Sequence, residues 1–545
     1  MTSTSTPPLE NNIAIGPDGD IGPNVIIGPD VTIGIIGAGT MGSGIALVAL
    51  FAGHRVILHD VVPVMLEQAK TYLEKFLTRK GQGDRMAKVQ FTADIEDFAP
   101  ATVIIEAALE DLPLKQDLFA RLERICVPET LLTTNTSTLP VTAIASAVST
   151  PARVAGFHFF NPAPILPLVE VVRGALTSQA TLDFLVALAT QMGKTPVVTR
   201  DTPGFIVNRV ARPFYGEALR LLGENVATHA QIDWAVQLGG GFRMGPFRLM
   251  DLIGIDINAA AMKSMYEQTF GEPRYRPHWI QAQMTQAKRF GRKSGQGFYD
   301  YRTEGEESIP TPPEVGDNAG TLILSEGSYA PGLAALCEQA GYALVHHPVP
   351  EMSPLAGLVF NGKNEGLKDA VIQMDATLPP DVPLLCQCAD APLTEIATWM
   401  DYPETLVGFD GLFFCNGTLV TLVSTPFLTD AIRQAAENFV RSLGRIPLWI
   451  EDSPGLILPR ILSMLINEAA FAVLEGVADA DTVDLAMRLG VNYPRGLVEW
   501  GQEIGFGRVV AVLNHLQAEY GEDRYRACSL LRRWARNENL KNALK

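Results

Sequence analysis

Apolar residues in the first third of the chain fall into short runs that alternate with longer amphipathic stretches. Four runs have the length of buried strands, at residues 31–36, 102–106, 130–135 and 153–157. The stretches between them carry apolar positions at helical spacing, at residues 42–52, 64–80 and 112–125. Strands that alternate with helices predict a doubly wound parallel sheet, so we expect an α/β domain here.

From residue 201 the pattern becomes helical. The segment 201–209 (DTPGFIVNR) predicts the start of a long helix, with Thr202 as the N-cap, Pro203 at the first helical position and Asn208 about two turns in. Helical periodicity continues to about residue 289. An all-α domain is therefore expected behind the α/β domain.

A glycine-rich turn joins the first predicted strand to the first predicted helix. Gly37, Gly39 and Gly42 form the pattern G-x-G-x-x-G, and Asp60 ends the next strand. In a dinucleotide site such glycines allow a tight turn, the approach of a pyrophosphate and close packing, and the acid binds the ribose. A carboxylate there would repel a 2′-phosphate, so the pattern predicts a Rossmann-type domain that binds NAD rather than NADP. The competing interpretation is a structural turn without a phosphate.

Polar residues gather where three predicted strands end. The clusters are residues 106–115, residues 135–137 and His158. Ligands of such sheets bind at the carboxyl ends of the strands, so we expect the clusters to share a site. Glu170 lies in the apolar segment 168–172, where a carboxylate is costly unless it is paired. A His158–Glu170 pair would fix the imidazole tautomer and raise its basicity, as a general base requires, although a core histidine with a chance acid nearby is the alternative.

The second half of the chain repeats the first. A shift of 251 aligns residues 201–239 with 452–490 without gaps and with 14 identities in 39, and a shift of 288 aligns residues 31–60 with 319–348. The two shifts differ by 37, so the second α/β unit is expected to lack about that many residues in its interior. In the same comparison, the apolar pattern aligns residues 168–170 with residues 422–424.

The repeat does not keep the polar positions. Gly37, Gly42, Asp60 and Asn208 fall on Ser325, Ala330, Pro348 and Pro459, and the glutamate of the strand at 168–172 falls on Ser424. We therefore expect the second half to keep the fold and to lack the chemistry.

Bulk properties exclude several classes of function. The net charge of −17 and the pI near 5 argue against nucleic acid as a partner. Residues 31–53 carry no charge, but the five glycines between residues 34 and 44 weaken a membrane span, so no membrane association is expected. The six cysteines show no metal-ligand spacing, which predicts no metal site. The first lysine or arginine is Arg55, so we expect no signal peptide and a cytoplasmic location.

Six segments are predicted from these patterns. The first carries Ile-Gly pairs at a period of six, like a hexapeptide β-helix, but it is too short to stack. The segments are an extended lead-in at 1–30, an NAD-binding Rossmann domain at 31–200, a helical substrate or dimerisation-type domain at 201–302, an acidic, proline-rich linker at 303–318, a degenerate Rossmann-like domain at 319–451 and a second helical domain at 452–545.

Taken together, the motifs resemble the L-3-hydroxyacyl-CoA dehydrogenase family. The matching pieces are GAGTMG at 37–42, the clusters at 106–115 and 135–137, GFHFFNP at 156–162, the acid within 168–172, and 201–208. The resemblance covers residues 31–301 and continues as a degenerate copy, like the duplicated members that serve aromatic breakdown. It implies NAD-dependent oxidation of an L-3-hydroxyacyl-CoA to the 3-oxoacyl-CoA by hydride transfer.

The resemblance also implies residue roles. His158 would be the general base and Glu170 its orienting partner, while Ser137 and Asn208 would hydrogen-bond the reacting oxygen and position the acyl group. NAD would be held by Gly37, Gly39, Met41, Gly42, Asp60, Glu110 and Lys115.

The resemblance bears on assembly as well. Single-length members of the family pair through their helical domains, so we expect the second helical domain to make the chain a monomeric pseudo-dimer, with a homo-oligomer as the alternative. The competing function is an NAD-binding structural or regulatory protein with vestigial activity. The four catalytic candidates stand together in one half, which argues against it.

Overall fold

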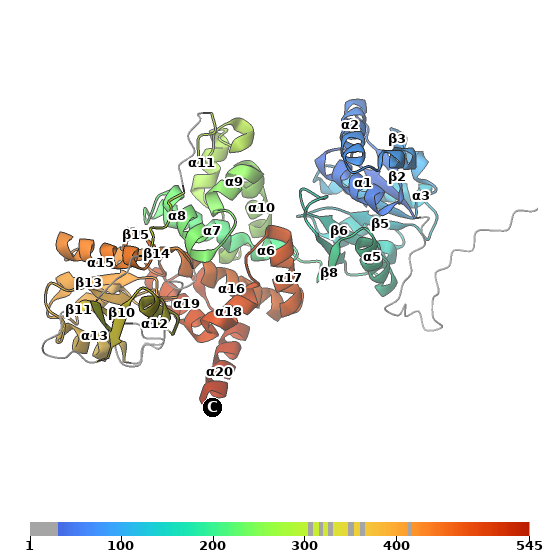
Figure 1. Cartoon of the computed structure of the whole chain (residues 1–545). Coiled ribbons are helices and arrows are strands. Elements are labelled where there is room, and N and C mark those ends of the chain that lie inside the picture. The colour runs from blue at the N-terminus through green and yellow to red at the C-terminus, as the bar shows by residue number, and fades with distance from the viewer. Residues whose placement is uncertain are drawn as a thin grey trace, which may run out of the picture. The chain divides into compact units, whose positions relative to one another are not determined.

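The computed structural model describes residues 31–302, 309–315, 320–324, 331–346, 354–359, 366–412 and 417–543. The lead-in at residues 1–30 and the second-half counterparts of the glycine turn, at 325–330, and of Asp60, at Pro348, lie outside these ranges. The chain forms two compact units (Figure 1). The first runs to Arg209 and also includes Gly476–Val491, and the second holds the rest.

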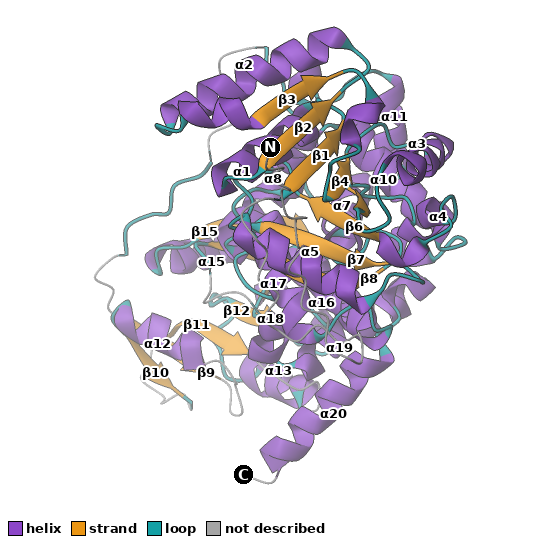
Figure 2. Cartoon of the chain, turned by 90° about the vertical axis from the view of Figure 1, so that its right-hand side faces the viewer, coloured by secondary structure: helices purple, strands orange, loops and turns teal. Residues whose placement is uncertain are grey.

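The first unit contains an eight-stranded sheet in the order β3-β2-β1-β4-β5-β6-β7-β8. Figure 2 shows β3, β2, β1 and β4 side by side in it. All neighbouring strands are parallel except β6 and β7, which are antiparallel. The strands are β1 Thr32–Ile36, β2 Arg55–His59, β3 Val89–Thr92, β4 Val103–Glu106, β5 Leu131–Thr134, β6 Val154–Phe159, β7 Leu168–Arg173 and β8 Thr195–Arg200.

Helices cover both faces of this sheet. Ile33 and Ile35 of β1 join one core with α1, α2 and α5, whereas Ile36 joins a second core with α3 and α4. Because the inner strands are buried on both faces, their sequences are largely apolar rather than alternating, whereas the edge strands β3 and β8 also carry exposed residues. The helices are α1 Thr40–Ala52, α2 Pro63–Arg79, α3 Leu112–Ile125, α4 Val141–Ala145 and α5 Gln179–Gln191. The doubly wound α/β domain predicted from the sequence is confirmed.

The second sheet repeats this arrangement with seven strands, in the order β10-β9-β11-β12-β13-β14-β15. In the described chain it ends at β10, where the first sheet continues to β3. Residues 60–102 separate β2 from β4, whereas only residues 346–353 separate β10 from β11, so the predicted deletion falls there. The strands are β9 Gly320–Leu324, β10 Tyr342–Val345, β11 Pro354–Val359, β12 Leu384–Gln387, β13 Leu406–Phe409, β14 Leu419–Ser424 and β15 Ile446–Glu451, and the helices are α12 Pro331–Gln339, α13 Leu367–Asp375, α14 Leu393–Ala397 and α15 Asp430–Ser442.

The remaining helices build the two helical domains. The first has α6 Val207–Val210, α7 Arg212–Gly223, α8 His229–Trp234, the π-helix η4 Ala235–Gly239, α9 Pro246–Ile253, α10 Ile255–Gln268 and α11 Trp279–Gln286. The second has α16 Leu458–Leu474, α17 Ala480–Val491, α18 Leu497–Ile504, α19 Phe506–Tyr520 and α20 Ser529–Ala543. Among the described residues, no helix is long and apolar enough to cross a membrane.

The predicted long helix with Thr202 as its N-cap is wrong. Gly204 has φ 74° and Phe205 φ 49°, so the chain makes a left-handed turn there and cannot continue as a helix from residue 203. The first helix begins at Val207, which makes Asn208 its second residue rather than a residue two turns in. Gly455 and Leu456 repeat the turn in the second half, with φ 73° and 53°.

Candidate active site

The glycine turn has the shape that a pyrophosphate needs. Gly37 has φ 95°, and a Cβ at Gly42 would lie 1.8 Å from the Gly37 carbonyl oxygen, so neither position accepts a larger residue. A Cβ at Gly39, in contrast, would meet no atom within 4 Å. Gly39 is also the N-cap of α1 and caps it without a side chain, so the first amides of the helix face open space. These residues fit the diphosphate of NAD.

Asp60 faces this turn from the end of β2. Its Oδ2 accepts a hydrogen bond from the Ala38 N–H at 2.8 Å, and its Oδ1 accepts one from the Val62 N–H at 2.9 Å. The carboxylate is therefore held beside the glycine turn, at the edge of the sheet where the sequence predicts the ribose.

His158 and Glu170 form a buried pair. Antiparallel pairing of β6 and β7 places the two residues opposite each other, and Nδ1 of His158 lies 2.8 Å from Oε2 of Glu170. β6 runs through His158 to Phe159, past the predicted strand end. His158 is 5% exposed and Glu170 is fully buried. Since Nδ1 donates to the carboxylate, the lone pair of the neutral ring is on Nε2.

The other oxygen of Glu170 is held by the turn that follows β8. Its Oε1 accepts hydrogen bonds from the N–H groups of Ile206 at 3.1 Å and Val207 at 3.0 Å. The left-handed conformation of Gly204 and Phe205 directs these amides toward β7. Glu170 is thus fixed at both oxygens, and Asn208 follows directly on the same turn.

Asp201, at the start of that turn, has a structural role. Its carboxylate accepts hydrogen bonds from the N–H groups of Val141 at 3.0 Å and Thr142 at 2.7 Å, which caps α4. Asp452 caps α14 in the same way through the Thr394 N–H at 2.8 Å. This shared task explains why both halves keep the acid although only one keeps His158.

The loop after β5 joins this site through Asn135. Its Oδ1 accepts a hydrogen bond from the Phe159 N–H at 2.8 Å, which brings the following residues, including Ser137, beside the His158 strand. The Ser137 N–H donates to Oε1 of Glu110 at 3.0 Å. The same oxygen accepts from the hydroxyls of Thr136 at 2.7 Å and Thr138 at 2.9 Å. Glu110 therefore shapes the loop that carries Ser137.

Burial of Glu110 alone would raise its pKa. The nearby Lys115 ammonium and the hydrogen bonds from Thr136 and Thr138 outweigh that effect and lower the pKa below its usual value. Glu110 is thus a carboxylate at neutral pH, as its acceptor role in the loop requires.

Lys115 is 1% exposed and lies between two acids. Its Nζ is 2.6 Å from Oε1 of Glu106 and 3.4 Å from Oε2 of Glu110. Glu106 also accepts from the Thr134 hydroxyl at 2.7 Å. It begins the predicted polar cluster at 106–115, but no role of its own was predicted for it. An acid that ends an apolar strand is the signal that could have identified it. Contact of Glu110 and Lys115 with NAD stays a prediction.

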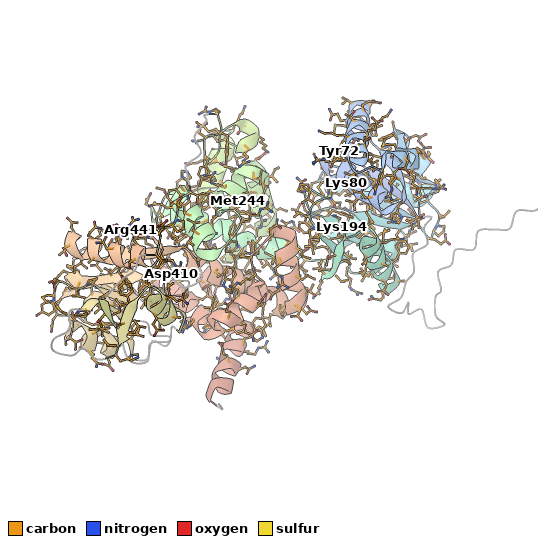
Figure 3. All side chains as sticks on the ribbon, viewed as in Figure 1. Tyr72, Lys80, Lys194, Met244, Asp410 and Arg441 are labelled. Atoms are coloured by element: carbon orange, nitrogen blue, oxygen red, sulfur yellow. The ribbon has the colours of Figure 1, made fainter. Side chains whose placement is uncertain are left out.

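The loop that follows His158 packs on the helix of the glycine turn. A Cβ at Gly44 would lie 3.3 Å from the Ala163 Cβ, so the glycine lets the loop approach α1 closely. Lys194, labelled in Figure 3, donates from Nζ to the carbonyl oxygens of Ala163 and Leu166 and so holds the loop. Burial lowers the pKa of Lys194 to about 8.

The second sheet lacks the histidine–glutamate pair. Gly408 lies opposite Val423 as Gly156 lies opposite Val172, so Asp410, labelled in Figure 3, takes the place of His158. Leu419 pairs with Ile446 as Leu168 pairs with Thr195, which places Thr421 at the position of the strand glutamate. The pairing of residues 168–170 with 422–424 was therefore wrong by three residues.

No metal site is evident in the described parts of the chain, where no three histidine, cysteine or acidic side chains are grouped to hold an ion. The described cysteines are free and buried, at positions 126, 337, 386, 388 and 528.

Comparison with known proteins matches both kinds of domain. The family model described as "3-hydroxyacyl-CoA dehydrogenase, NAD binding domain" matches residues 32–202. The model "3-hydroxyacyl-CoA dehydrogenase, C-terminal domain" matches residues 204–301 and again 455–544, in agreement with the duplication.

Similar proteins include chains of both lengths. The 3-hydroxyadipyl-CoA dehydrogenase of Escherichia coli K12 is 38% identical over 517 residues, which cover 92% of this chain and 97% of that protein. A probable 3-hydroxybutyryl-CoA dehydrogenase of Deinococcus radiodurans is 41% identical over 276 residues, 49% of this chain and 99% of its own. The crystal structure of 3-hydroxybutyryl-CoA dehydrogenase from E. coli K12 matches with a TM-score of 0.79 and 36% identity, over 95% of this chain and 100% of that one.

These matches confirm the predicted NAD cofactor and dehydrogenase activity, and they do not support a structural or regulatory protein with vestigial activity. The chain belongs to the 3-hydroxyacyl-CoA dehydrogenase family, and it catalyses the NAD-dependent oxidation of a 3-hydroxyacyl-CoA to the 3-oxoacyl-CoA.

Proposed function

We propose that His158 is the general base that removes the proton from the C3 hydroxyl of the substrate. The observation that carries this proposal is the Glu170 carboxylate, which binds Nδ1 of His158 with one oxygen and two backbone amides with the other. This arrangement leaves Nε2 to accept the proton and stabilises the imidazolium that forms. NAD, when bound, would supply the acceptor for the hydride that leaves C3.

Ser137 and Asn208 are proposed to hydrogen-bond the oxygen from which the proton leaves. Both side chains are partly exposed, and both follow segments tied to the His158 pair, through Asn135 and through the Val207 amide. Negative charge grows on that oxygen as the proton departs, and fixed donors stabilise such charge by ~3 kcal/mol each.

The diphosphate of NAD is proposed to lie on the amides at the start of α1, with Gly37, Gly39 and Gly42 as its turn, Met41 beside it and Asp60 at the ribose. The open space above Gly39 supports this placement. The positive end of the α1 dipole favours the phosphates there.

The acyl chain of the substrate is proposed to end in a carboxylate. A relative that matches 92% of the chain, second half included, is named for 3-hydroxyadipyl-CoA, whereas a solved structure that matches 95% of the chain is named for 3-hydroxybutyryl-CoA. We expect kcat/KM for 3-hydroxyadipyl-CoA to exceed that for 3-hydroxyhexanoyl-CoA, which has the same carbon chain without the terminal carboxylate, by ~10-fold or more. NADH formation measured with both, and with 3-hydroxybutyryl-CoA, tests this. Equal values would remove the carboxylate proposal, and no NADH with any of them would remove the proposed reaction.

The chain is proposed to work as a monomeric pseudo-dimer. Within the second unit the two helical domains form reciprocal ion pairs. Oε1 of Glu217 in the first domain accepts a hydrogen bond from Arg524 of the second at 2.6 Å, and Oε2 of Glu468 in the second accepts one from Arg274 of the first at 3.0 Å. All four side chains are buried. We therefore expect the purified protein to sediment with the mass of one chain, 59.0 kDa. A stable species of twice that mass would contradict the proposal.

A further inference from the structure

A segment of the degenerate half belongs to the unit that carries the histidine–glutamate pair. Residues Gly476–Val491, which include α17, group with the first unit although the chain on both sides of them lies in the second. The Val477 carbonyl oxygen accepts hydrogen bonds from the Arg200 N–H at 3.0 Å and the Thr199 hydroxyl at 3.4 Å. The segment is thus anchored at the end of β8, just before the turn that binds Glu170.

The C-terminal end of α17 lies against that turn. A Cβ at Gly490 would be 2.8 Å from Cδ2 of Leu168 and 3.0 Å from Cγ2 of Val207. Leu168 shares a face of β7 with Glu170, because residues two apart in a strand point the same way. Val207 supplies one of the two amides that hold Glu170. A side chain at Gly490 would therefore press on the strand that carries Glu170 and on one of the two residues whose amides hold its carboxylate.

The second sheet has the mirror arrangement. There Gly239 of the first helical domain takes the place of Gly490, and its Cβ would lie 3.4 Å from Cδ2 of Leu458 and 3.6 Å from the Leu419 oxygen. The Leu238 carbonyl oxygen accepts a hydrogen bond from the Thr418 N–H at 2.8 Å. In each half, a helix of the helical domain thus packs against the sheet of the other half. Of these two helices, only α17 packs against the sheet that carries the histidine–glutamate pair.

We propose that α17 of the degenerate half is part of the catalytic centre, and that Gly490 is a positioning residue for the general base. The proposal rests on the proposed role of His158. Val207 is β-branched and restricted in its rotamers, so it cannot move aside when the space at Gly490 is filled, and its backbone must shift instead. A shift of its amide releases Glu170, and with it His158. This role of α17 would explain why the chain keeps a second half that lacks the catalytic residues.

The test replaces Gly490 by alanine in the full chain. We expect kcat to fall ~10-fold, since a small misplacement of a catalytic group costs about that much or more. The KM for NAD should stay unchanged, because the glycine turn is not touched. The acid limb of the pH profile of kcat/KM should move to lower pH, because a carboxylate farther from the imidazole stabilises the imidazolium less.

Two control variants add the same methyl group elsewhere, one at a crowded glycine and one at the mirror position, where the new Cβ meets no atom closer than 3.4 Å. Gly501→Ala in α18 is equally crowded, with Phe506 and Ile466 atoms at 2.8 and 2.9 Å from the new Cβ, but Gly501 lies in the second unit and Gly490 in the first. Gly239→Ala is the mirror position on the second sheet. Both should keep the wild-type kcat and pH profile. The double variant Gly490→Ala/Val207→Ala removes the Val207 atoms that the new Cβ meets and leaves only the terminal methyl group of Leu168. It should therefore recover the kcat and acid limb of Val207→Ala alone.

The outcomes separate two failures. If Gly490→Ala keeps the wild-type kcat and pH profile, the α17 proposal is overturned. It is also overturned if kcat falls while the acid limb stays in place and the double variant does not restore kcat. A His158→Gln enzyme measured alongside, if it keeps full turnover, overturns the assignment of the base and with it this proposal. If Gly490→Ala does not fold, Val207→Ile adds a methyl group toward the same glycine and gives the same measurement.

Discussion

Replacing His158 by glutamine is expected to lower kcat by ~10²–10⁴-fold and to leave NAD binding intact. Glutamine has a similar volume, and its amide can donate to Oε2 of Glu170, so the buried site keeps its shape. It has no lone pair that takes a proton near neutral pH. NADH formation with a 3-hydroxyacyl-CoA measures the loss, and titration with NAD alone measures binding.

The matched control lies in the degenerate half. Asp410 occupies the position of His158 in the second sheet, so Asp410→Asn should leave kcat unchanged. The wild-type kcat/KM should fall in acid, where the imidazole is protonated and cannot act as a base, and His158→Gln should lose that acid limb. Turnover of His158→Gln within ~10-fold of wild type would show that another group removes the proton.

The His158–Glu170 pair could be predicted because its physical reason is local. A carboxylate in an apolar strand must have a partner, and the partner proved to be the predicted one, at 2.8 Å. The same reasoning applies to Glu106 at the end of β4, because this buried carboxylate is paired as well, with Lys115 and Thr134. The glycine turn was predictable for a similar reason, since the positive φ of Gly37 and the close approach of Gly42 to the Gly37 carbonyl oxygen both lie within the turn itself.

Features that depend on distant contacts were not predictable. The two amides that hold Glu170 come from a left-handed turn, where the sequence pattern favoured a helix from Thr202. The apolar strand β14 reads LVTLVS, and its two Leu-Val pairs fit the LVE of β7 equally well. Only the pairing of Leu419 with Ile446 decides the register. The packing of α17 against the sheet of the other half could not be predicted from the sequence of α17 itself.

Replacing Glu217 by glutamine is expected to destabilise the second unit by about 3–5 kcal/mol, the usual cost of removing one partner from a buried ion pair. Glu217 is fully buried. Its Oε1 accepts from Arg524 at 2.6 Å, and its Oε2 accepts from Arg460 at 2.9 Å and from the Tyr525 hydroxyl at 3.1 Å. Both arginines are buried as well. The neutral amide would leave two guanidinium charges without the carboxylate that compensates them.

Acid should reveal the same interaction in the wild-type protein. Burial alone would raise the pKa of Glu217, but Arg524 and Arg460 outweigh it and lower the pKa to about 2. A carboxyl whose folded pKa lies below its unfolded value stabilises the fold fully above the unfolded value, near pH ~4.3, and loses this contribution as the pH falls through about 2. The free energy of unfolding should therefore fall in this window in the wild type, and Glu217→Gln should lack this part of the fall.

The control for Glu217→Gln is Glu267→Gln, which removes an exposed partner of Lys263 at 3.8 Å and should cost less than about 1 kcal/mol. Urea unfolding followed by intrinsic fluorescence measures both. Since Glu217 and its three partners join the two helical domains, the variant should also expose part of that interface and associate at high concentration, where we expect the wild type to stay at the mass of one chain. A Glu217→Gln protein with the wild-type unfolding midpoint and mass would mean that the domains pair through their apolar contacts alone.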